Sequence, residues 1–172
     1  TVDQGPTATT VDDNLTSWGA SLAAKMGFGP FGLSVEGQYG YNWQNTRGLT
    51  GVSFAAKNNA ATLVNDGTKI EDAKGYGIWL DASWKFGSVT PHFIWGMMGS
   101  ESEHYNSVTD ANYDLDGQSM MFGFSVPIDL AKGFRLRPEI FWYDDGDKEY
   151  SDRADENLGK YLIAGVQFQI TF

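Results

Sequence analysis

The chain has 172 residues, 41% of them hydrophobic and 15% aromatic, which is enough apolar material for one folded domain and excludes a disordered chain. Its 22 acidic and 12 basic side chains leave a formal net charge of -10, which excludes a nucleic-acid partner that needs a basic face. Cysteine is absent, so disulfides, thiolate zinc sites and cysteine nucleophiles are excluded. Neither a signal peptide nor an apolar run long enough for a transmembrane helix is present, and we expect a mature chain or a fragment.

Residues 1–16 are polar, show no periodicity and are predicted to form an external loop. Residues 17–172 show almost no helical spacing. They contain seven segments of roughly 10 to 14 residues in which apolar and polar residues alternate, and each segment is predicted to be a β-strand. In chain order the predicted strands are residues 18–28, 31–43, 76–86, 89–98, 120–130, 134–142 and 160–172.

The last predicted strand shows the alternation most clearly. Its even-numbered residues from Leu162 to Phe172 are all apolar, whereas Tyr161, Gly165 and Gln167 belong to the opposite face. The other strands repeat this division into an apolar face and a face of glycine, serine and charged residues. A water-soluble β-sandwich would also alternate, but its outward face would be more highly charged and contain less glycine.

The connections between the predicted strands fall into two classes that alternate along the chain. Residues 29–30, 87–88 and 131–133 form short turns, whereas residues 44–75, 99–119 and 144–159 form long polar loops. This alternation is typical of a transmembrane up-and-down β-barrel, with short turns on the periplasmic side and long loops outside. Strands of about 10 residues tilted by about 40° span the roughly 25 Å apolar band of such a barrel.

Aromatic residues gather at both ends of the predicted strands, as expected for two girdles at the membrane interfaces. Those near the short turns are Phe28, Phe31, Trp84, Phe86, Phe134 and Phe172. Those near the long loops are Trp18, Tyr41, Trp43, Tyr76 and Trp142.

The closing segment 161–172, YLIAGVQFQITF, resembles the final strand of Gram-negative outer-membrane proteins, in which a terminal Phe preceded by alternating apolar residues is read by the barrel-assembly machinery. Within this class the chain is most similar to porins. The resemblance implies an integral protein of the bacterial outer membrane, with a water-filled channel for passive diffusion of small hydrophilic solutes and ions. It also implies contact with outer-membrane lipid and lipopolysaccharide, assembly as a homotrimer, no enzymatic activity and no cofactor.

The number of predicted strands suggests that other strands complete the barrel. Phe172 is expected on the periplasmic side, so seven strands place residues 1–16 outside, whereas a single-chain barrel starts in the periplasm and has an even strand number. We expect the C-terminal portion of a barrel of about 16 strands, whose remaining strands precede Thr1 or belong to another chain. The alternatives are a complete barrel of about eight strands with a structural or adhesive role, in which residues 50–56 form a further strand, and a lipid-modifying or proteolytic barrel.

Charged residues on the predicted polar faces, together with one histidine, are expected to line the channel: Lys25, Glu36, Asp81, Lys85, His92, Asp129, Arg135, Arg137 and Glu139. The basic residues are expected nearer the short turns, and Glu36, Asp81 and Glu139 near mid-height. Glycine and serine between them favour a wide, water-filled barrel over a packed ion-pair interior. The outer segments together carry 18 acidic and 6 basic side chains, so a mild preference for cations is expected.

The two histidines of the chain are also candidates for catalysis. His92 is expected near Asp81 and Ser83 if neighbouring strands align, which would assemble a serine, a histidine and an acid, but no nucleophile motif accompanies them. His104 lies between two glutamates, an arrangement similar to that of outer-membrane proteases, although a solvated loop is expected there. We predict no catalytic residues.

Acidic residues in the outer segments are candidates for weak binding of Ca²⁺ or Mg²⁺. Asn112, Asp114 and Asp116 precede Gly117 with the spacing of oxygen ligands that begins a calcium loop, but the twelfth position is Gly123 rather than Glu, so the full motif fails. Residues 144–149 form a second acidic group. At the outer rim of a barrel, such ions would bridge lipid phosphates.

Overall fold

The computed structural model describes residues 17–42, 62–64, 69–106, 111–151 and 154–171. These residues form one ten-stranded antiparallel sheet and a separate two-stranded sheet, and no helix occurs among them. A search of the same residues for a helix long and apolar enough to cross a membrane finds none. The predicted all-β, antiparallel, up-and-down class is therefore confirmed.

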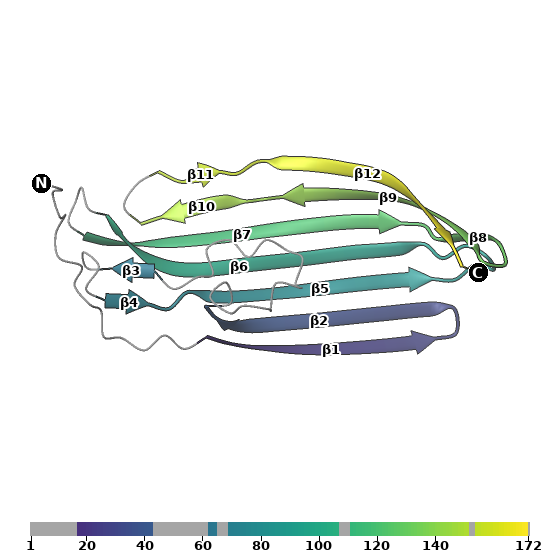
Figure 1. The fold of residues 1–172 in the computed structure, drawn as a ribbon, viewed down its shortest axis with the longest axis horizontal. Helices are drawn as coiled ribbons and strands as arrows, with labels where there is room; N and C mark the ends of the chain where they lie inside the picture. Colours follow the sequence, from purple (N-terminus) through teal and green to yellow (C-terminus); the bar gives the residue numbers. More distant parts are fainter. Residues whose placement is uncertain (1–16, 43–61, 65–68, 107–110, 152–153, 172) are drawn as a thin grey trace, which may run out of the picture.

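Long strands form the body of the large sheet and run side by side along its length (Figure 1). Adjacent strands are antiparallel, and the order across the sheet is the order along the chain. The long strands are β1 (Trp18–Phe28), β2 (Phe31–Tyr41), β5 (Lys74–Trp84), β6 (His92–Asn106), β7 (Ala111–Ser125), β9 (Phe134–Asp144) and β12 (Lys160–Ile170). Each overlaps one of the strands predicted from the sequence.

The large sheet is open. β1 and β12 form its two edges, and every residue of both strands is exposed. The described residues therefore do not close into the predicted barrel, and the sheet presents two unpaired edges of 11 residues each.

The remaining strands are short: β3 (Thr62–Val64), β4 (Lys69–Glu71), β8 (Ile128–Ala131), β10 (Asp147–Tyr150) and β11 (Glu156–Asn157). β3 and β4 pair with each other, β8 pairs with β9, and β10 pairs with both β7 and β11. β10 continues the course of β9 after a break at Gly146, which has a φ of 65° and donates its backbone N–H to the Asp144 carboxylate at 2.9 Å.

The polar segment 99–119 is not the long loop that the sequence predicts. β6 and β7 stay paired through it, from Gly99 opposite Gln118 to Asn106 opposite Ala111. Polar residues occupy both alternating sets of positions here, so the periodicity ends although the backbone ladder continues. β10 and β11 likewise occupy part of the predicted loop at 144–159. The predicted loop 1–16 and the alternative strand 50–56 lie outside the described residues.

The short turns lie together at one end of the sheet, where β12 also ends (Figure 1). Between β1 and β2 the turn is so tight that Phe28 and Phe31 pair directly. Gly29 and Gly87 have φ values of 56° and 59°, a conformation in which a side chain with a Cβ is strained. Glycine is therefore required where these hairpins reverse.

Apolar side chains are distributed in the reverse of the manner found in a water-soluble domain. The buried hydrophobic residues of the described part are Ala73, Met98 and Met121. Along β7, by contrast, Phe122 and Phe124 are exposed while Gly123 and Ser125 are buried. We call the surface that carries Phe122 and Phe124 the apolar face and the opposite surface the polar face. Such an extended exposed apolar surface marks an interaction with something other than water.

Aromatic side chains contact one another at both ends of the strands. At the loop end the rings of Trp18 and Tyr41 lie 5.6 Å apart, on β1 and β2. At the turn end the Trp84 ring lies 6.1 Å from Phe31 and 6.0 Å from Phe86. Aromatic pairs of this kind contribute about 0.5–1.5 kcal/mol each beyond the area that they bury. They hold adjacent strands together on the apolar face.

The two faces of β12 differ in their expected tolerance of charge. Phe168 lies opposite Leu136 on the apolar face and is 66% exposed, whereas Gln167 lies opposite Arg137 on the polar face. If the apolar face contacts hydrocarbon, Phe168→Arg lowers the free energy of unfolding by about 2–4 kcal/mol, and Gln167→Arg lowers it much less. Urea unfolding in lipid vesicles measures both losses. Equal losses would contradict the assignment of the two faces.

Candidate pore-facing wall

The strand register places the predicted channel-lining residues on the polar face. One row of paired residues crosses all the long strands and consists of Gly27, Gly32, Ser83, His92, Ser125, Glu139 and Gly165. Lys25, Glu36, Asp81, Arg135 and Arg137 occupy the same alternating set of positions in neighbouring rows. Lys85 directly follows β5 and donates its backbone N–H to the Pro30 carbonyl at 2.8 Å. The sheet therefore gathers side chains from six long strands onto one wall.

Asp81 and His92 form the best-defined polar contact of this wall. His92 Nδ1 lies 2.8 Å from Asp81 Oδ1 and 3.1 Å from Oδ2, and both side chains are largely shielded from solvent. Ser83 is paired with His92, as the alignment of strands requires, but its hydroxyl donates to the Gly32 carbonyl at 3.4 Å. The carboxylate thus orients the imidazole on the wall, while the serine hydroxyl bonds to the backbone instead.

The arginines lie toward the short turns, each beside an acid. Arg135 Nε donates a hydrogen bond to Asp129 Oδ1 at 2.6 Å, which makes a charge-assisted ion pair. Arg137 Nε lies 3.2 Å from Glu139 Oε2, an ion pair without hydrogen-bond geometry, and this enclosed Nε finds no hydrogen-bond acceptor among the described residues. Both acids partly neutralise the positive charge at this end of the wall.

Basic and acidic residues of the wall are less clearly separated by their distance from the short turns than the sequence predicts. Lys25 lies opposite Ser34, which lies opposite Asp81, so Lys25 and Asp81 share one row. β5 ends at Trp84, paired with Phe31, instead of at the predicted residue 86. Asp81 therefore lies closer to the short turns than the sequence predicts. Neither Lys25 nor Glu36 forms an ion pair with another described residue.

Apolar side chains also occupy the polar face, on β5, β6, β7, β9 and β12. They are Trp79, Ile94, Met98, Met121, Phe141, Tyr143, Tyr161 and Ile163. The Phe141 ring covers Gly123 so closely that a Cβ there would clash with it. The signal was present in the sequence, since Phe141, Tyr143 and Ile163 sit at odd positions of strands whose even positions are apolar too. Alternation alone assigns such residues to neither face.

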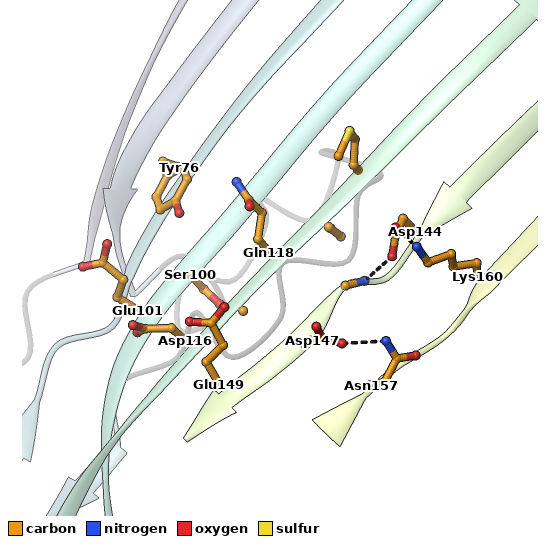
Figure 2. Close-up of a pocket in the computed structure, with 14 residues that line it drawn as sticks. Tyr76, Ser100, Glu101, Asp116, Gln118, Asp144, Asp147, Glu149, Asn157 and Lys160 are labelled. Carbon is orange, nitrogen blue, oxygen red and sulfur yellow. Dashed lines mark hydrogen bonds and ion pairs between the residues drawn. The ribbon is translucent and has the colours of Figure 1, made fainter. Parts of the chain in front are cut away.

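An acidic group lies beyond the apolar band, beside a cavity of about 390 Å³ (Figure 2). Glu101, Asp116 and Glu149 are neighbours on β6, β7 and β10. Burial, followed by the charges of Glu101, Asp114 and Glu149, raises the pKa of the Asp116 carboxyl above its ordinary value. Positive charge is supplied at the margins of this group, where Lys74 pairs with Glu101 at 2.9 Å and Lys160 with Asp144 at 2.8 Å.

The structure changes the setting of the predicted cation ligands. Asn112, Asp114 and Asp116 lie within β7, where alternate residues are spread along an extended strand instead of wrapping around an ion. No group of three or more histidine, aspartate or glutamate side chains that could hold a metal is found among the described residues. His104 lies in β6, opposite Tyr113. Weak binding of Ca²⁺ or Mg²⁺ stays a prediction.

Comparison of the chain with protein-family models, with curated proteins and with solved structures finds no significant match.

Ion preference tests whether the carboxylates of the polar face line a conducting path. Removing the charges of Glu36 and Asp81 together, by Glu36→Gln with Asp81→Asn, is expected to shift selectivity toward anions, because fixed negative charge enriches cations near it. The reversal potential of a single channel in a salt gradient measures the shift. Gln38→Asn, which changes no charge on the same face, is the control. An unchanged potential in the double variant would show that these carboxylates lie off the path.

Stability in the acidic group is expected to depend on pH. A raised pKa means that ionised Asp116 lowers the free energy of unfolding. This destabilisation disappears as the pH falls below the ordinary pKa of aspartate. Asp116→Asn should therefore raise the melting temperature in detergent at pH 7 and leave it unchanged at about pH 3. An equal shift of the melting temperature at both pH values would contradict the assignment.

Proposed function

We propose that this sheet is part of the wall of a bacterial outer-membrane porin, through whose water-filled channel small hydrophilic solutes and ions diffuse passively. In this proposal the apolar face contacts membrane lipid, the polar face lines the channel and the long loops face outward. Cations are mildly preferred, and the protein assembles as a homotrimer.

The observation that carries the proposal is the opposite chemistry of the two faces. Exposed residues of the apolar face include Leu22 at 80% and Phe124 at 48%, whereas the polar face carries glycine, serine and charged side chains. Water on both sides would leave the apolar face without a partner. Lipid on one side and water on the other would satisfy both faces, which is the situation of a strand in a barrel with an aqueous channel.

The course of the apolar band across the strands supports the same proposal. Its outermost residues are Tyr41 on β2, Tyr76 on β5, Met120 on β7, Trp142 on β9 and Leu162 on β12. We follow the paired residues across the sheet from β2 to β12, which is five strands away. Compared with these paired residues, the boundary of the apolar band lies about six residues closer to the turns on β12 than on β2. With about 3.3 Å per residue and about 4.8 Å between strands, the shift corresponds to a tilt of about 40° between the strands and the normal of a flat boundary. Strands of transmembrane barrels are tilted by about 35–45°.

The open edges indicate what the rest of such a barrel must supply. β1 and β12 are the first and the last of seven successive antiparallel strands, so both run toward the short-turn end. Pairing them directly would create a parallel pair. Antiparallel closure needs an odd number of additional strands between the edges, which makes the total even, as in barrels of about 16 strands. In lipid both edges must be paired, because unpaired backbone groups in hydrocarbon cost several kcal/mol each.

Conductance tests the proposal directly. The protein, purified from membranes in detergent, is added to a planar lipid bilayer, and stepwise current increases with linear current–voltage behaviour are expected. Heat-denatured protein is the control. Insertion into vesicles, shown by protection from protease, without any conductance would contradict the porin proposal and favour a plugged barrel.

A further inference from the structure

A cavity of about 250 Å³ lies on the polar face, where β6, β7, β9 and β12 meet. Gly96, Met121, Tyr143 and Tyr161 line it from these four strands, and the register places them in one row of the polar face. This row lies two polar-face positions closer to the loops than the row of His92. The cavity therefore lies on the loop side of His92.

Two tyrosine rings form a flat wall of this cavity. Tyr143 and Tyr161 are paired across β9 and β12, and their ring centroids lie 4.9 Å apart with an angle of 11° between the ring planes. Tyr161 is 45% exposed, so the stacked pair still presents ring surface. A further aromatic ring can continue this stack in the offset arrangement that aromatic pairs prefer.

The rest of the lining leaves room for one ring beside the tyrosines. Gly96 lies next to Met121 and contributes no side chain. Met98 and Met121 have flexible thioether side chains, which adapt to the shape of a ligand and make favourable contacts with aromatic rings. An apolar cavity of about 150 Å³ accepts benzene, so a cavity of about 250 Å³ accommodates a ring and the beginning of a substituent.

The lining offers little to a charged ligand. Asp145 borders the cavity but already has a partner in the protein, and no lysine or arginine is among the described lining residues. In the row of the cavity, Trp79 separates Gly96 from the charged position at Glu36. An ionised group would therefore lose water here without a free partner of opposite charge, which is unfavourable.

Apolar surface on this wall supplies the driving force for binding. Ile163 lines the cavity beside Tyr161, and these two side chains are 52% and 45% exposed. In a water-filled channel their apolar atoms contact water until a solute covers them. Removing such surface from water is favourable in proportion to the area covered, whatever the charge of the rest of the solute.

We propose that this cavity is a solute subsite of the channel and binds the ring of an uncharged aromatic solute. The ring lies against Tyr161 and the two methionines, while a hydroxylated substituent stays in the channel water. The inference deepens the proposed function and rests on it in one respect, since the solute reaches the cavity through the channel interior.

Equilibrium binding tests the subsite without requiring conductance. Isothermal titration calorimetry of the folded protein in detergent uses three probes: phenyl β-D-glucoside, methyl β-D-glucoside and phenyl phosphate. Phenyl β-D-glucoside is expected to bind at least tenfold more tightly than the others, because the second probe lacks the aromatic ring and the third joins the ring to a charged group. Equal binding of methyl β-D-glucoside or of phenyl phosphate, or no binding of phenyl β-D-glucoside, would overturn the proposal.

Variants locate the binding site. Tyr161→Ser should weaken binding of phenyl β-D-glucoside by about fivefold, the scale of one aromatic pair, whereas Tyr161→Phe keeps the ring and should retain binding. Tyr39→Ser is the matched control, because Tyr39 is 42% exposed on the apolar face, and it should leave binding unchanged. Circular dichroism verifies that each variant is folded. Equal weakening by Tyr161→Ser and Tyr39→Ser would place the probe elsewhere and overturn the proposal.

Conductance measurements separate this inference from the proposed function. If the channel conducts and phenyl β-D-glucoside does not bind, the subsite is wrong and the porin proposal stands. If phenyl β-D-glucoside binds with the expected variant pattern and no conductance is found, the cavity is a binding site and the porin proposal is wrong.

Discussion

The hydrogen-bond ladder between successive antiparallel strands is the interaction on which the structure depends. The described residues bury few apolar side chains, so packing of a core cannot hold the strands in place. Each long strand instead pairs with its neighbour over most or all of its length, and β6 and β7 remain paired well beyond the apolar band. Backbone pairing sets the register, and the register decides which side chains meet.

A single layer of long strands leaves most of both faces of the sheet uncovered by other described strands. In water, the apolar face would need a second layer, and the large sheet has none among its described strands. The chemistry of the environment must therefore differ on the two sides. This requirement links the alternation of residues to the proposal of a membrane wall, and the slant of the apolar band agrees with the strand tilt of transmembrane barrels.

Register also gives the polar face its internal organisation. Asp81 and His92 meet because their strands are adjacent and their positions differ by one row, although they are 11 residues apart in the chain. Tyr143 and Tyr161 come together in the same way, across β9 and β12. The polar face consequently carries charged side chains on β1, β2 and β5 and on the turn-side part of β9, whereas its apolar side chains gather on the loop side of β6, β7, β9 and β12.

Local periodicity alone determined the all-β class, the position of each long strand and the assignment of Phe122, Phe124 and Phe168 to one face, because alternation depends only on residues two apart. It failed for the extension of β6 and β7, where polar residues occupy both faces. Only the tertiary structure decided which residues pair across strands, that Lys25 shares a row with Asp81 and that Tyr143 stacks on Tyr161. These contacts depend on where each strand ends and on how neighbouring strands align, which are properties of pairs of strands rather than of any one segment.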